Sequence, residues 1–207
     1  MDAFFPAIKA SNAPPIYPTV ETVSASAPSN ITRTDYVMAD GEQGTYQALR
    51  LMADAVRGDC GPDYSGYLDD FNYRAANQIV SGLGIRGAHD VIAALFRFVR
   101  DQIAYVNHPM NLQVVQDCRR TLELRTGDCV SKSVCLATLL AAQGIPSRFV
   151  AQHPNHDQSF SHVYVETSEG QVALDSIADG KEGRPLFSVN QRPLLPNGGF
   201  EMPWKIF

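Results

Sequence analysis

The sequence predicts an α+β fold, in which several helices come first and a small antiparallel sheet follows. Two changes of pattern support this prediction. Apolar residues recur every three or four positions between residues 49 and 106, which is the spacing of amphipathic helices. After residue 146 apolar and polar residues alternate, which is the period of half-buried strands. The composition, with 44% apolar and 19% charged residues, is that of an ordinary globular chain.

Three amphipathic helices are predicted in the first half of the chain. Their apolar stripes cover residues 49–56, 68–79 and 92–106. Gly58 and Gly82 are expected to end the first two helices, and Asp90 is expected to cap the start of the third.

A fourth helix is predicted over residues 129–143. It is apolar on nearly every face, which indicates a helix that is buried all round. Three strands follow at residues 147–152, 162–167 and 171–176, and the last two are expected to form a hairpin across residues 168–170. This order of elements completes the α+β prediction.

The two ends of the chain have a different character. Prolines interrupt both ends, so neither shows a helical or strand period. We expect an extended proline-rich arm at residues 1–30, a folded domain at 31–182 and an extended apolar tail at 183–207. Residues 1–30 and 183–207 are the segments through which we expect the chain to bind a protein partner or another copy of itself.

Charge and hydropathy argue against several classes of protein. The net charge is −5 and there is no run of Lys or Arg, so nucleic-acid binding is not expected. The longest strongly apolar stretch, residues 134–142, is too short to span a membrane. An acid at position 2 stands where a signal peptide carries bases, so we expect a cytoplasmic location without cleavage of a leader. Four cysteines in a chain of this length indicate reduced thiols, and no disulfide scaffold is expected.

One cysteine has a context that favours reactivity. In the run Thr126-Gly127-Asp128-Cys129, Asp128 can cap the buried helix, which places Cys129 in its first turn. Free N–H groups and the positive end of the helix dipole stabilise a thiolate there, and they can also bind an oxyanion. The structural alternative is a small, unreactive core residue.

The predicted hairpin carries a histidine and an aspartate that could assist this cysteine. In one register His162 stands directly opposite Asp175, and after a shift of two residues the pair is diagonal on the same face. After a shift of one residue they point to opposite faces. A shared face would let the carboxylate orient the imidazole, which could then accept the thiol proton of Cys129. Alternatively, each residue satisfies only local hydrogen bonds.

Other polar clusters are less specific, and we expect neither a metal nor a cofactor. The candidate metal ligands lack paired spacing; they are Cys118, Cys129, Cys135, His153, His156 and His162. His153 is a reserve candidate for the base but is expected, like His156, on a solvated loop. Cys60 and Cys118 have no helix-start context, and Cys135 is expected to be inert packing. Asn107, Asn111 and Gln113 precede Cys129 and remain open candidates for a second oxyanion donor.

Five segments in order resemble the transglutaminase-like superfamily over residues 45–178: 96–106, 121–129, 139–150, 161–166 and 173–175. The resemblance implies a papain-like core with Cys129 as nucleophile, His162 as general base and acid, and Asp175 as the orienting carboxylate. Such members often carry an acidic residue directly after the cysteine, whereas this chain has Val130-Ser131-Lys132. The long form is similar to members encoded by phages and prophages, and this resemblance implies a virion-associated location as the alternative to a cytoplasmic one.

The sequence therefore predicts a cysteine acyl-transfer enzyme. It would attack a peptide or carboxamide carbonyl, form a thioester on Cys129 and transfer the acyl group to water or an amine. A protein or peptide is the expected substrate. The alternative is a non-catalytic structural or docking component of a larger, phage-like assembly built on the same core.

Overall fold

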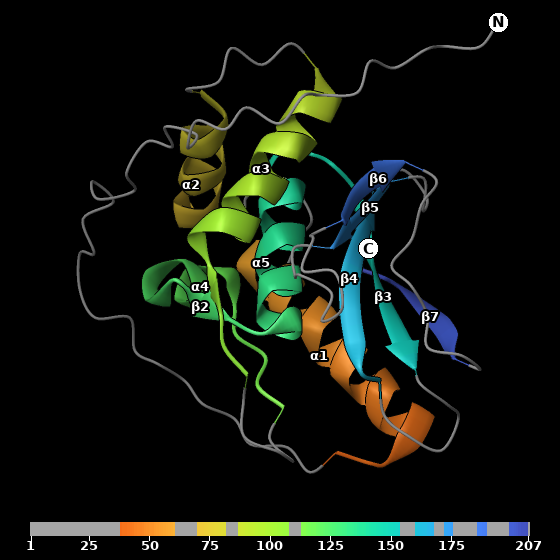
Figure 1. Ribbon diagram of the computed structural model, residues 1–207. Coiled ribbons are helices and arrows are strands. Elements are labelled where there is room, and N and C mark those ends of the chain that lie inside the picture. The colour runs from red at the N-terminus through yellow and green to blue at the C-terminus, as the bar shows by residue number, and fades with distance from the viewer. Residues whose placement is uncertain are drawn as a thin grey trace, which may run out of the picture.

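The computed structural model of the protein confirms the α+β prediction (Figure 1). The structure describes residues 38–60, 70–81, 87–107, 113–153, 160–167, 172–175, 186–189 and 199–206. The predicted arm at residues 1–30 lies outside these ranges, as does Gly82. Among the described residues no helix combines the length and the apolar character that crossing a bilayer requires.

The described residues form five helices, one strand pair and one larger sheet. The helices are α1 (Gly41–Cys60), α2 (Asp70–Ser81), α3 (Ala88–Gln102), α4 (Cys118–Leu124) and α5 (Cys129–Ala142). Strands β1 (Ala104–Tyr105) and β2 (Thr126–Gly127) pair in parallel. The sheet contains β3 (Ser147–His153), β4 (His162–Thr167), β5 (Val172–Asp175), β6 (Leu186–Val189) and β7 (Phe200–Lys205).

Helix α5 is the centre of the fold, as its apolar sequence predicts. It packs against α1, α2, α3 and α4 and against strands β3 and β4. In Figure 1 the helices α2, α3 and α4 lie on one side of α5 and the sheet lies on the other. Twelve of its fourteen residues are buried. The helix ends at Gln143, after which Gly144 takes a positive φ of 67° that favours glycine.

The ends of the helices differ from the predicted ones. Helix α1 continues through Gly58 to residue 60, because burial of its apolar stripe outweighs the modest helix penalty of one glycine. Gly87, and not Asp90, is the N-cap of α3. The stripe of α3 was predicted to reach residue 106, but Ile103 is already extended at φ −110° and ψ 108°. Backbone pairing with β2 takes residues 104 and 105 out of the helix.

The sheet has five strands in the order β6-β5-β4-β3-β7, and all neighbours are antiparallel. The sequence predicted only the central three. The segment 183–207, predicted as an extended tail, contributes both edge strands. Pro203 is tolerated in β7 because an edge strand does not need every N–H for pairing. Trp204 packs against Tyr46 of α1 with ring centroids 5.7 Å apart, so β7 is anchored on the helical layer.

Candidate active site

The start of α5 places Cys129 as predicted. Asp128 is the N-cap, and its Oδ1 accepts a hydrogen bond of 2.9 Å from the backbone N–H of Ser131. Cys129 is the first residue of the helix, is a free thiol and is partly exposed. A sulfur in this position faces the positive end of a helix whose first N–H groups have no acceptor within the helix.

The sheet brings His162 and Asp175 together. Strands β4 and β5 pair Val165 with Leu174, which makes His162 and Asp175 diagonal neighbours on one face. The Nε2 atom of His162 lies 2.6 Å from Oδ2 of Asp175. The Asp175 side chain is only 4% exposed, whereas that of His162 is 23% exposed. The carboxylate therefore holds one ring nitrogen and leaves Nδ1 for another partner.

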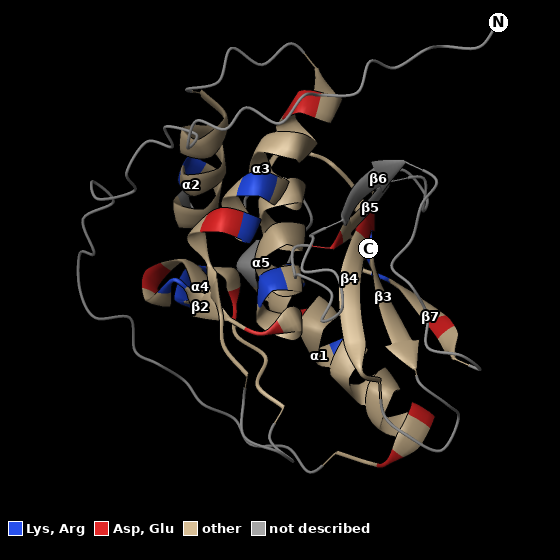
Figure 2. Ribbon diagram, viewed as in Figure 1, with Lys and Arg blue, Asp and Glu red and all other residues tan. Residues whose placement is uncertain are grey.

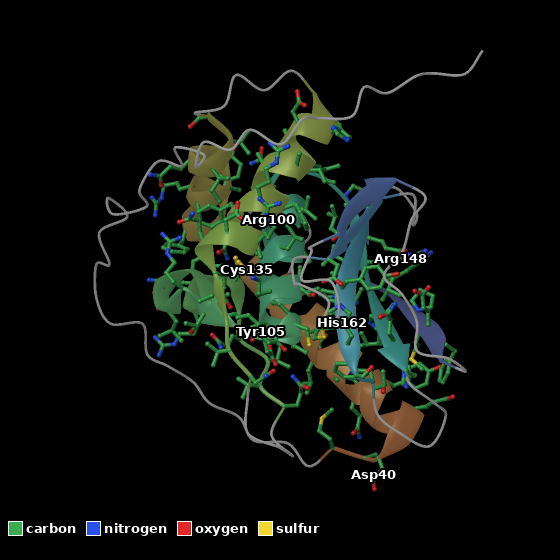
Figure 3. The ribbon with its side chains drawn as sticks, in the orientation of Figure 1. Asp40, Arg100, Tyr105, Cys135, Arg148 and His162 are labelled. Carbon is green, nitrogen blue, oxygen red and sulfur yellow. The ribbon has the colours of Figure 1, made fainter. Side chains whose placement is uncertain are left out.

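Cys129 is the second group that acts on the imidazole. Burial by itself would lower the pKa of His162, but hydrogen bonds to Asp175 and to Cys129, together with their negative charges, raise it to about 10. A protonated imidazole is thus the favoured form at neutral pH. In Figure 3, His162 lies near the end of α5 at which Cys129 stands.

The structure adds Tyr105 to this site, a residue that the sequence placed in the third helix. The β1–β2 pairing sets Tyr105 beside Gly127, two residues before Cys129. Burial raises the pKa of the Tyr105 phenol, and the negative charges of Cys129, Asp128 and Asp175 raise it further. The helical stripe through residue 103 concealed the change to a strand. The aromatic and β-branched pair at residues 105 and 106 was the available signal for a strand.

The three open candidates for an oxyanion donor have different surroundings. The Oδ1 atom of Asn107 accepts a hydrogen bond of 2.8 Å from the Tyr105 hydroxyl. The amide nitrogen of Gln113 donates to Oδ2 of Asp128 at 3.2 Å, so this side chain supports the helix cap. Asn111 lies outside the described residues.

Two expectations about the other thiols and histidines are wrong. Cys118 does begin a helix, α4, whose N-cap Asp117 accepts from the backbone of the helix. Its Sγ is 3.3 Å from that of Cys135, and both thiols are fully buried. His153 is not solvated but ends β3 fully buried, stacked on Phe200 at 4.5 Å between ring centroids. His156 lies outside the described residues, among which no group of three His, Cys, Asp or Glu side chains could hold a metal ion.

A buried polar network continues from His162 along its face of the sheet. The ring of Tyr164 stacks with that of His162, with centroids 6.4 Å apart. The Tyr164 hydroxyl lies within hydrogen-bond distance of Glu166 and Glu201, at 3.1 and 3.0 Å. Arg148 pairs with the fully buried Glu166 through two nitrogens, at 2.9 and 2.8 Å. This network fixes the strand that carries the imidazole.

Residues 73–175 match the family model described as the Transglutaminase-like superfamily. The chain contains a transglutaminase-like domain. The matched segment includes Cys129 and His162 and ends at Asp175. Comparison of the sequence with curated proteins gives no match.

Solved structures with similarity to this transglutaminase-like chain include two bacterial proteins. A "putative protease" from Parabacteroides distasonis has 16% identity and a TM-score of 0.47, covering 71% of this chain and 31% of its own. A "putative cysteine protease" from Cytophaga hutchinsonii has 16% identity and a TM-score of 0.44, covering 64% of this chain and 45% of its own. The chain thus spans less than half the length of either protein.

Proposed function

We propose that the protein is a cysteine acyl-transfer enzyme whose nucleophile is Cys129. The observation that carries the proposal is the alignment of three groups: a sulfur at a helix start, an imidazole beside it and a buried carboxylate 2.6 Å from that imidazole. This is the geometry in which one group attacks, the second transfers protons and the third orients the second. The transglutaminase-like domain supports the same assignment.

In the first half of the reaction the Cys129 thiolate attacks the carbonyl carbon of a peptide or carboxamide. The electron pair of the carbonyl moves to oxygen, and the backbone N–H of Cys129 at the helix start is well placed to stabilise the resulting oxyanion. The oxyanion then collapses, the C–N bond breaks and the imidazolium of His162 gives its proton to the leaving nitrogen. A thioester on Cys129 and a neutral imidazole remain.

In the second half His162 acts as a base. It removes a proton from water or from a primary amine, which attacks the thioester carbon and expels the Cys129 thiolate. Water gives a carboxylic acid, so the enzyme would be a protease or amidase, and an amine gives a new amide, as in cross-linking. Asp175 stabilises the imidazolium in both halves through the bond to Nε2.

We infer that the substrate is a protein or peptide, because the site lies at a helix end that is open enough to leave Cys129 partly exposed. Association with a phage-like assembly remains a proposal that rests on the sequence resemblance. Its test is deletion of residues 1–30, which should abolish incorporation into the assembly while leaving the chemistry of Cys129 intact.

Peptide-resolved alkylation tests the proposed function. Folded protein is treated with iodoacetamide at pH 7, and labelling of the four cysteines is followed by mass spectrometry over time. We expect Cys129 to react fastest, and we expect His162→Ala to remove this advantage because the imidazolium no longer stabilises the thiolate. Cys135→Ser is the matched control, since it removes a buried thiol and should leave the rate at Cys129 unchanged. Four slow and similar rates would instead favour the non-catalytic structural role.

A further inference from the structure

Lys132 is a charged residue in the first turn of α5, only three positions after Cys129. It belongs to the segment that departs from the family pattern of an acidic residue directly after the cysteine, but it is 2% exposed and does not reach the solvent around the sulfur. Helix α5 is otherwise without charged residues and is almost entirely tan in Figure 2. A buried cation in such a helix needs a partner inside the protein.

The partner of Lys132 is the end of helix α3. Its Nζ donates a hydrogen bond of 2.8 Å to the backbone oxygen of Ile103 and one of 3.4 Å to that of Arg100. The last carbonyls of a helix receive no hydrogen bond from the backbone of that helix. A cation is the favoured group at that end of the helix dipole. Ile103 is also the residue from which the chain enters β1. The amine of Lys132 therefore fixes the point where α3 becomes β1.

The stem of the same side chain supports β2. A Cβ built on Gly127 would lie 3.6 Å from Cγ of Lys132 and only 2.9 Å from Cβ of Ser131, so the β2 backbone rests directly on the first turn of α5. The two strands are joined by backbone hydrogen bonds from Ala104 to Arg125 at 2.8 Å, and from residue 106 to Gly127 at 3.2 Å. Lys132 thus binds the residue that precedes β1 with its amine and packs against β2 with its aliphatic chain.

We propose that Lys132 is a positioning residue, which holds the β1–β2 pair on the first turn of α5 and so fixes Tyr105 beside Cys129. The effect of the β1–β2 pair on catalysis rests on the proposed function, whereas the placement of Tyr105 does not. A change of about 1 Å in the position of groups around a reacting atom can lower a rate by about a hundredfold. Loss of the amine is therefore expected to slow acylation while the fold is retained.

The charge of Lys132 gives this role a pH dependence. Burial lowers its pKa to about 8; the charges of Asp101, Cys135 and Asp175 oppose this shift, and that of Arg100 adds to it. Above that pH the neutral amine binds the two carbonyls more weakly than the ammonium does. Stability changes in the other direction, because the unfolded chain holds this proton up to pH 10.5 and the folded chain does not. As the pH rises through 8, the acylation rate should fall while the contribution of Lys132 to the free energy of unfolding rises. A lysine with only a structural role would not make the rate and the stability change in opposite directions.

The test compares wild type with Lys132→Met, which keeps the stem and removes the amine. The exposed Lys205→Met on β7 is the control. Tyrosines are labelled at the ring Cζ, the Tyr105 signal is assigned with Tyr105→Phe, and its titration is followed by NMR. We expect Lys132→Met to lower the pKa of Tyr105 toward 10, because the ring becomes less buried and leaves its negative neighbours, and Lys205→Met to leave it unchanged. An unchanged Tyr105 titration in folded Lys132→Met would overturn the proposal.

The second measurement is the rate at which an activated ester acylates Cys129 between pH 6.5 and 9.5. Wild type should lose activity with an apparent pKa near 8, and Lys132→Met should be slower by about tenfold or more without that alkaline decline. If Lys132→Met does not fold, two other measurements take its place. One is the pH profile of the wild type, and the other is the Tyr105 titration of Lys132→Arg, in which we expect the pKa of Tyr105 to stay near the wild-type value. Absence of acylation in wild type with the expected change in the Tyr105 titration would refute the proposed function and keep the positioning role.

Discussion

Replacement of Asp175 by asparagine removes the charge that faces the His162 ring while keeping the size of the side chain. The pKa of His162 is raised from 6.5 to about 10 in the folded protein. A rise of that size corresponds to roughly 5 kcal/mol of interaction with the charged imidazole, at about 1.4 kcal/mol per pH unit. Cys129 contributes part of it. If Asp175 supplies half or more, Asp175→Asn should lower the free energy of unfolding by about 3 kcal/mol at pH 6.

The pH dependence follows from the direction of this shift. Because the folded-state pKa lies above the unfolded value, the stabilisation is fully present below about pH 6.5 and is lost as the pH rises through about 10. The difference between wild type and Asp175→Asn should therefore be largest at pH 6 and shrink toward pH 10.

Urea unfolding at pH 6, 8 and 10 measures this difference, with the fluorescence of the single tryptophan, Trp204, as the probe. Far-UV circular dichroism provides an independent probe of the same transition. A difference that is the same at all three pH values, or one below about 0.5 kcal/mol at pH 6, would refute the reasoning. Such a result would mean that the carboxylate does not stabilise a charged imidazole.

Two further substitutions test the packing around the site. Gly127→Ala should cost about 1–3 kcal/mol in thermal or urea unfolding, because its Cβ would lie 2.9 Å from that of Ser131. Gly58→Ala is its control and should be slightly stabilising, since nothing lies within 4 Å of the new Cβ and the site is helical. Arg148→Met should cost about 3 kcal/mol in urea unfolding, because it leaves the carboxylate of Glu166 buried without its cation.

The partly exposed pair of Arg119 and Glu123 on α4 is the control for the last substitution. Both side chains are about a third exposed or less, at 32% and 26%, and their nitrogen and oxygen atoms are 3.2 Å apart. Arg119→Met should therefore cost less than about 1 kcal/mol. Equal losses in the two variants would contradict the view that burial of Glu166, and not ion pairing as such, sets the cost.

Periodicity predicted those parts of the fold that local pattern controls. The buried helix at residues 129–143 and the three central strands agree with α5, β3, β4 and β5 within a few residues. The diagonal placement of His162 and Asp175 was one of two registers that the sequence left open as productive. Alternation along a strand fixes which face a side chain takes, but only the pairing of backbones selects between those registers.

Long-range pairing explains what the sequence could not predict. Tyr105 falls within the range of the third predicted helix, and only the pairing with a strand distant in sequence makes it part of the site. The edge strands β6 and β7 carry no clear alternation and include a proline, and they become strands because partners are present. Nothing in the sequence around Lys132 shows that its amine would bind the end of α3. In each case a contact between separated segments outweighs the local signal.

The measurement that tests the account most directly is the capture of an acyl group on the enzyme. The protein is mixed with p-nitrophenyl acetate at pH 7, release of p-nitrophenol is followed, and the acetylated residue is located by mass spectrometry. The account predicts a rapid release equivalent to one acetyl per chain, carried as a thioester by Cys129, absent in Cys129→Ser and much slower in His162→Ala. Acetylation spread over several residues at similar rates, or unaffected by His162→Ala, would contradict it.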